Sequence, residues 1–123
     1  MSFILTVSHR LEKINELIQQ ELGKIILAEE EFGLDVLVTI LAAQTSNDQH
    51  QCAVTLSVWP EDKGPDILKK LNRRLAYFQA LLNKKMKVRP MPTIKLILNT
   101  DEATSQKIET LIAKLKVNGT DND

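Results

Sequence analysis

The stretch from Lys69 to Lys95 constrains the fold of this chain most strongly. It contains nine basic residues and no acidic residue, so its formal charge is +9. The rest of the chain holds seven basic and sixteen acidic residues, which gives −9 and a net charge of zero. A concentrated basic segment is the usual electrostatic footprint for a polyanion. The candidate binding residues are Lys69, Lys70, Arg73, Arg74, Lys84, Lys85, Lys87, Arg89 and Lys95.

An apolar stripe runs through the same stretch and predicts helical structure. The pattern fits one helix that reaches about Met86, or two helices that meet near Ala76, and periodicity does not separate these alternatives. Two prolines then end the helical region, and residues 93–98 predict a strand. A run of charges is often only a solvated helix face. Because this segment also carries an apolar stripe and ends in a predicted strand, it is part of the fold and not a tail. The stripe consists of Ile67, Leu71, Leu75, Phe78 and Leu82.

The first third of the chain predicts another amphipathic helix. Ser8 is a candidate N-cap, because its hydroxyl can accept a hydrogen bond from a free backbone N–H. Gly33 is the candidate residue for closing the helix. Glu29, Glu30 and Glu31 near its end predict a solvated, acid-rich loop. The apolar face recurs at helical spacing through Leu11, Ile14, Ile18, Leu22 and Ile25.

Two strands are predicted after this helix, at residues 36–41 and 53–59. A cluster of polar residues separates them, so we expect an antiparallel hairpin. The second strand alternates, with Leu56 among the apolar positions and Thr55 and Ser57 between them. This alternation predicts a half-buried strand whose threonine and serine face away from the core.

The remaining residues predict a short C-terminal helix and a disordered tail. Thr100 is the candidate cap of this helix, and residues 117–123 form the tail. A chain of 123 residues is long enough for one domain with its own core. We therefore expect a single domain over residues 1–116 in an α+β class.

Several kinds of function are disfavoured by the composition. The single Cys52 excludes an internal disulfide and indicates a reducing compartment. His9 and His50 have no partners at metal-ligand spacing, and no acidic pair suggests acid–base catalysis. No apolar run reaches the roughly 18 residues of a membrane span. We expect a cytoplasmic protein that is not an enzyme and needs no cofactor or metal.

The predicted order of elements, α-β-β-α-α-β plus a short final helix, is that of the type II KH-like fold, in which helices back a three-stranded sheet. Four stretches make the likeness more specific: residues 10–22, residues 38–40 with 53–58, residues 71–98, and Asp101 with Leu111 and Leu115. On these residues the chain resembles the ribosome-binding factor A family. The resemblance implies a monomer that binds the immature small (30S) ribosomal subunit and assists late maturation of 16S rRNA.

The resemblance also implies a bend between the two central helices. The family has a kinked Ala-Xxx-Gly there, whereas this chain has Arg74, Leu75 and Ala76 at the matching site. If the helices bend near Ala76, we expect two backbones to approach closely there, so that only a small side chain fits. If the helix is straight and exposed at this point, a larger side chain should be harmless.

The basic segment predicts RNA binding through phosphate contacts with little reading of bases, because Lys and Arg neutralise phosphates and aromatic residues are only 4% of the chain. The alternative is a generic RNA-binding or protein-interaction module of KH-like fold, whose basic face meets an acidic partner. Loss of binding after RNase treatment distinguishes the first interpretation from a protein partner.

Overall fold

The computed structural model describes residues 2–99, with side chains from residue 9 onward. The predicted order of helices and strands is confirmed over this range, whereas the predicted C-terminal helix and tail lie outside it. The elements are α1 (Ser2–Glu29), β1 (Leu37–Thr45), β2 (Gln51–Trp59), the short 3-10 helix η1 (Glu61–Lys63), α2 (Gly64–Arg73), α3 (Leu75–Lys85) and β3 (Thr93–Leu98).

The three strands form a mixed sheet in the order β1-β2-β3. β1 and β2 form the predicted antiparallel hairpin, with Ile40 opposite Leu56, and β3 pairs parallel to β2. β2 therefore has a neighbour along each edge. Leu56 belongs to the core cluster and Thr55 does not, so the predicted facing of this strand is confirmed, but Thr55 is only 8% exposed and the strand is not half-buried as predicted. A central strand is covered more completely than a half-buried hairpin strand.

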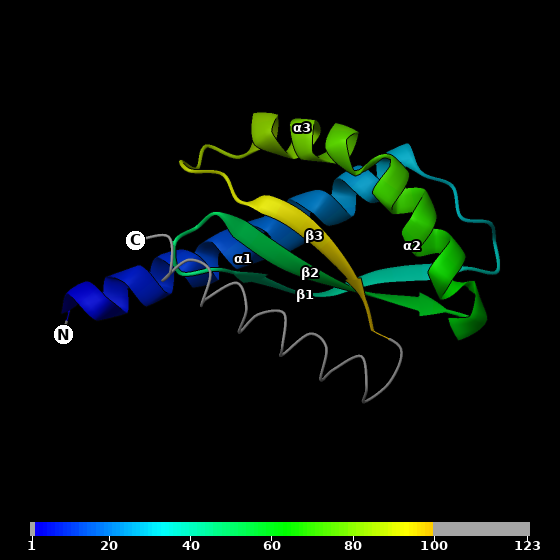
Figure 1. Ribbon diagram of the computed structural model, residues 1–123, viewed down its shortest axis with the longest axis horizontal. Coiled ribbons are helices and arrows are strands. Elements are labelled where there is room, and N and C mark those ends of the chain that lie inside the picture. Colours follow the sequence, from blue (N-terminus) through cyan, green and yellow to red (C-terminus); the bar gives the residue numbers. More distant parts are fainter. Residues whose placement is uncertain (1, 100–123) are drawn as a thin grey trace.

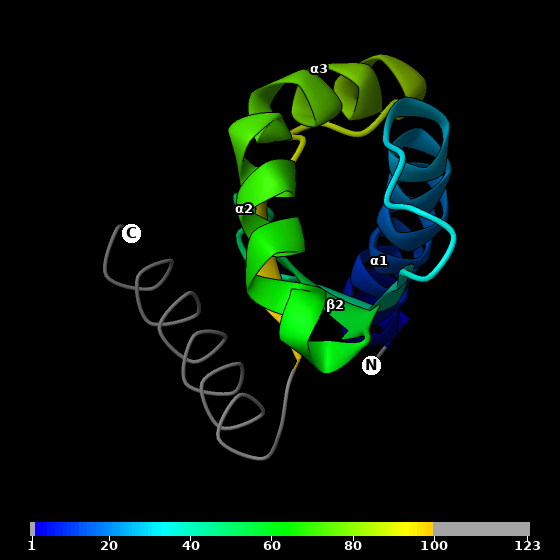
Figure 2. The ribbon, with the colours of Figure 1, turned by 90° about the vertical axis from the view of Figure 1, so that its right-hand side faces the viewer.

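The helices described lie over one face of this sheet. Figure 2 shows α1 and α2 on opposite sides, with α3 lying across them above the strands. α1 packs against β1 and α3, while α2 packs against β2 and β3. The helices and the sheet thus enclose a single core between them, as expected for the type II KH-like fold.

α1 is longer at its start than the sequence predicted. It begins at Ser2, so Ser8 lies inside the helix and is not its N-cap. Residues 2–8 contain no proline or glycine that would stop the helix. The helix ends at Glu29, and Gly33 instead forms a later turn with a φ of 94°. The backbone N–H of Val36 donates to the carbonyl of Gly33 across this turn at 3.4 Å.

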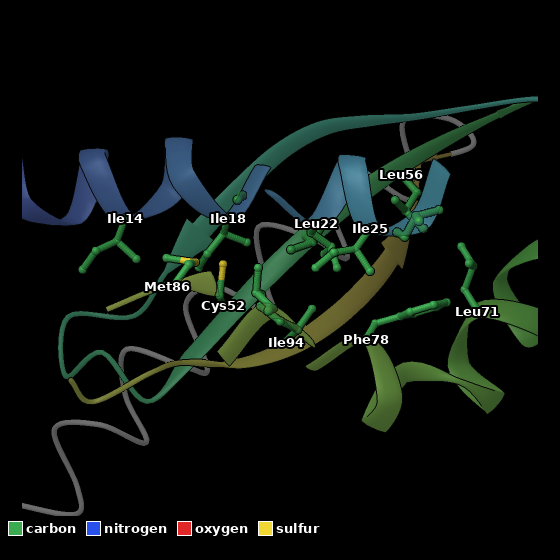
Figure 3. Packing of buried hydrophobic residues seen from close by; sticks show 14 of the residues in the cluster. Ile14, Ile18, Leu22, Ile25, Cys52, Leu56, Leu71, Phe78, Met86 and Ile94 are labelled. Atoms are coloured by element: carbon green, nitrogen blue, oxygen red, sulfur yellow. The ribbon is translucent and has the colours of Figure 1, made fainter. Parts of the chain in front are cut away.

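The core follows the apolar stripe of α1. Ile18 and Leu22 are fully buried, and Figure 3 shows them in a row with Ile14 and Ile25. In the same view Met86 lies at the Ile14 end of the row, whereas Leu71 and Phe78 lie at the opposite end. One helix therefore contacts both ends of the core.

Two helices, not one, span the basic segment, and they meet at Arg74. This residue leaves helical geometry, with φ −110° and ψ 11°, and its N–H donates to the carbonyl of Leu71 at 3.1 Å. Leu75 is half-buried, but Ala76 is exposed. The expected close approach of backbones at Ala76 is therefore wrong, because the bend turns the Ala76 side chain outward.

Leu56→Ala should lower the free energy of unfolding by roughly 2–5 kcal/mol, because Leu56 is fully buried in the central strand. Leu41→Ala is the matched control, since Leu41 lies in the same sheet but is 45% exposed. The control should cost less than about 1 kcal/mol. Urea denaturation of the two variants measures the difference. Equal losses would contradict the arrangement of the sheet described above.

Candidate nucleic-acid interface

The nine predicted cations divide into two groups according to their partners. Three of them, Lys70, Arg74 and Lys85, form ion pairs with glutamates of α1 or of the loop that follows it. Within residues 9–99, the other six have no acidic oxygen within 4.0 Å. These six are exposed: Lys69 and Arg73 on α2, Lys84 in the last turn of α3, Lys87 and Arg89 after it, and Lys95 on β3.

Arg74 is held by the glutamates at the end of α1. Its Nη1 lies 2.6 Å from Oε1 of Glu30 and also donates to the carbonyl of Glu29 at 3.0 Å. The Glu30 side chain is only 5% exposed, so its carboxylate is largely shielded from water, whereas the Arg74 side chain is 39% exposed. The hydrogen bond to Glu30 raises the pKa of the Arg74 guanidinium above its ordinary value, and the nearby negative charges of Glu30 and Glu29 add to this effect.

Lys70 reaches the same loop from the preceding turn of α2. Its Nζ donates to the carbonyl of Glu31 at 2.8 Å and lies 3.6 Å from Oε2 of Glu30. The ammonium also lies 5.6 Å from the centre of the Phe32 ring. The predicted solvated loop is therefore wrong for Glu30. We call the contacts of Lys70 and Arg74 with this loop the Glu30 clamp.

Beyond the clamp, α3 runs back above α1 (Figure 1). Lys85 near its end lies 3.7 Å from Oε2 of Glu21, in a pair that is partly open to solvent. The chain then continues toward the start of α1, where Nη2 of Arg10 donates to the carbonyl of Arg89 at 3.2 Å. Arg10 and Lys13 of α1 lie beside this segment, although Glu12 and Glu16 belong to the same turns of the helix. Basic residues consequently meet basic residues at this end.

A groove of about 320 Å³ lies between the first half of α1 and the segment after α3. We call it the basic groove. Its apolar residues are Ile14, Leu17 and Val88. Its four cationic residues are Arg10, Lys13, Lys87 and Arg89.

Side-chain amides hold the segment that forms one wall of the basic groove. Gln49 is buried, and its Nε2 donates to the carbonyl of Pro90 at 2.8 Å. Gln79 on α3 donates to the carbonyl of Pro92 at 3.1 Å and accepts the N–H of Ile94 at 2.8 Å. Both ends of the turn are thereby held, one by α3 and the other by the loop between β1 and β2.

The sequence prediction missed Arg10 and Lys13 as site residues. They are one helical turn apart on α1 and flank the buried Ile14, which is the signal that could have been used. The pattern did not indicate that Arg10 lies beside Arg89, because the two residues are 79 positions apart in the sequence.

Other chemistry has little support in the part of the chain that the structure describes. No three His, Cys, Asp or Glu side chains come together there as a possible metal site. Cys52 is fully buried, and burial raises the pKa of its thiol to about 11. Such a thiol remains protonated near neutral pH and is a poor nucleophile. None of the helices in this part is both long and apolar enough to cross a membrane.

The family model for ribosome-binding factor A matches residues 10–112 of the chain. The chain belongs to the ribosome-binding factor A family. The ribosome-binding factor A of Akkermansia muciniphila is 25% identical over 103 residues, which are 84% of this chain and 80% of that protein. The Dehalococcoides mccartyi protein of the same name is 26% identical over 111 residues, covering 89% of this chain and 94% of that protein.

Solved structures support the fold of this family member. The crystal structure of ribosome-binding factor A from Thermus thermophilus superposes with a TM-score of 0.62 at 23% identity, covering 72% of this chain and 94% of that one. A homology model of the Thermus thermophilus protein, fitted into a cryo-EM map of a 30S–RbfA complex, gives a TM-score of 0.55, also at 23% identity, over 66% of this chain and 86% of that one. The predicted family and its KH-like architecture are confirmed.

Glu30→Gln should lower the melting temperature, because it removes the charge that Lys70 and Arg74 share at a poorly hydrated position. Glu31→Gln is the matched control, since only the backbone carbonyl of Glu31 takes part in the clamp. Thermal denaturation followed by circular dichroism measures both. If the two variants melt together, the Glu30 clamp does not stabilise the bend at Arg74.

Proposed function

We propose that this protein is an assembly factor that binds the immature small (30S) ribosomal subunit and assists late maturation and processing of 16S rRNA. Membership of the ribosome-binding factor A family is the observation that carries the proposal. The relatives are named for ribosome binding, and a homology model of the Thermus thermophilus relative was fitted into a cryo-EM map of a 30S–RbfA complex. On this proposal the chain acts as a cytoplasmic monomer, without a cofactor, and catalyses no reaction.

The charge distribution supports a specific contact surface for the RNA. Lys84, Lys87 and Arg89 have no acidic partner among residues 9–99, and Arg10 and Lys13 lie across the groove from the last two. Arginine can hold phosphate in a two-pronged manner, whereas lysine acts as a point charge. We therefore place the main phosphate contacts at this end of the molecule.

The other predicted cations have secondary roles in this proposal. Lys69, Arg73 and Lys95 are exposed and remain candidates for outer phosphate contacts. Lys70 and Arg74 are engaged by the Glu30 clamp, so we assign them to the fold and not to the RNA. Lys85 could take either role. Its ion pair with Glu21 is partly open to solvent, so the lysine can exchange this partner for a phosphate.

The double variant Lys87→Gln, Arg89→Gln should weaken association with small subunits and reduce its dependence on salt. Each lost phosphate contact should lower the slope of log K against log salt by about 0.7 to 0.9. Folding should change little, because exposed charges contribute little to stability. Sedimentation with purified small subunits over a series of KCl concentrations measures both quantities.

The matched control is Lys24→Gln, Lys63→Gln, which removes the same charge at exposed positions away from the groove. It should retain nearly all of the affinity. Equal losses in the two double variants would mean that only diffuse charge matters. Association that survives RNase treatment of the particles would favour the alternative, a module that binds an acidic protein.

A further inference from the structure

The basic groove has an apolar floor, which phosphate binding alone does not require. Ile14 is 3% exposed, and Leu17 and Val88 are half-buried beside it. Lysines on a flat surface are sufficient to contact the phosphates of a duplex. A hollow with aliphatic walls instead favours a ligand that brings an apolar surface along with its negative charge.

The rim of the basic groove is positively charged, with no acidic residue among the described residues that line it. Four charged residues of the described part of the chain line it, and all four are cations. Arg10 is also oriented, because its Nη2 donates to the carbonyl of Arg89 at 3.2 Å. A guanidinium held in this way offers a planar face on which a nucleobase can stack.

The dimensions of the basic groove favour a small ligand over a folded one. Its 320 Å³ lies at the lower end of the roughly 300–1,000 Å³ typical of small-molecule sites. A second hollow of similar size, about 290 Å³, lies between α1 and β1, and none of the described residues that line it is charged. Val38 belongs to that second hollow, so the molecule contains an uncharged apolar site for comparison.

We propose that the basic groove holds one unstacked nucleotide of single-stranded RNA. Its base packs on Leu17 and Val88 and against the guanidinium of Arg10, while its phosphates lie among Lys13, Lys87 and Arg89. The protein accordingly prefers an unpaired segment to a continuous duplex, because a paired base must first lose its pairing and stacking before it can enter the groove. This inference rests on the proposed RNA-binding function and adds the kind of RNA that the site takes.

The first test makes one residue of the apolar floor polar and leaves every charge in place. Val88→Ser should weaken binding to a single-stranded RNA hexamer by about 5-fold or more, which is the scale of one lost base-stacking contact. The salt slope should stay the same, because no phosphate contact is lost. Affinity for a fully paired RNA duplex should not change. Fluorescence anisotropy with labelled RNA measures all three.

Val38→Ser is the matched control, since Val38 is a half-buried valine in the uncharged hollow. It should leave hexamer binding as in the unmodified protein. Equal weakening by Val88→Ser and Val38→Ser, or equal loss of hexamer and duplex binding in Val88→Ser, would overturn the proposal.

A second test uses the unmodified protein and remains decisive if Val88→Ser fails to fold. Titration with adenosine 5′-monophosphate should shift the NMR methyl signals of Leu17 and Val88, whereas inorganic phosphate should shift only signals near the cations. Methyl signals that respond to neither ligand, or equally to both, would show that no base packs on Leu17 and Val88 and would overturn the proposal.

The two proposals fail in different ways. If Lys87→Gln, Arg89→Gln retains full association with small subunits, the proposed RNA contact at this end is wrong. If that variant loses association while Val88→Ser binds the single-stranded hexamer normally, the RNA contact stands and the nucleotide site is wrong.

Discussion

The burial of the apolar stripe of α1 is the constraint on which the rest of the structure depends. This one helix packs against β1 and α3, and its side chains reach both ends of the core. Because α3 must lie along the same stripe, the chain is led back past α1 in the opposite direction. The polar contacts at the two ends of α1 follow from this path. Glu30 meets Arg74 at one end, and Arg10 meets Arg89 at the other.

Local patterns were sufficient to predict the elements but not all of their ends. The helical spacing from Ile14 to Ile25 and the alternation around Leu56 identified a helix and a strand, because both patterns reflect burial on one side. Ser8 and Gly33 were wrongly predicted to be the helix ends. A residue type that favours capping does not end a helix when the residues beyond it also adopt helical geometry, as residues 2–7 do before Ser8. The burial of Thr55 was not predicted, because alternation indicates which residues face the core but not how far the opposite face of the strand is covered.

The charge of the basic segment was correctly noticed, but its distribution over the surface could not be predicted. Counting residues gives the basic segment a charge of +9. The charge that it presents to a ligand is lower, because glutamates elsewhere in the chain pair with some of its cations. Glu30 is 44 positions from Arg74, and no periodicity connects them. The same limitation concealed Arg10 and Lys13, because a contact over 79 positions leaves no local signal. The resemblance to a family supplied the fold, and only the arrangement in space separated the paired cations from the unpaired ones.

The pairing of charge within the fold has a consequence for how the molecule meets a polyanion. A protein of zero net charge is not drawn as a whole toward RNA at long range. Among the described residues, Lys84 and the cations of the basic groove lie toward the first half of α1, while Glu29 and Glu30 at its other end hold Lys70 and Arg74. Attraction between exposed charges is largely screened beyond about 8 to 10 Å at physiological salt. The groove should therefore attract a polyanion only at close range, after the two molecules have met.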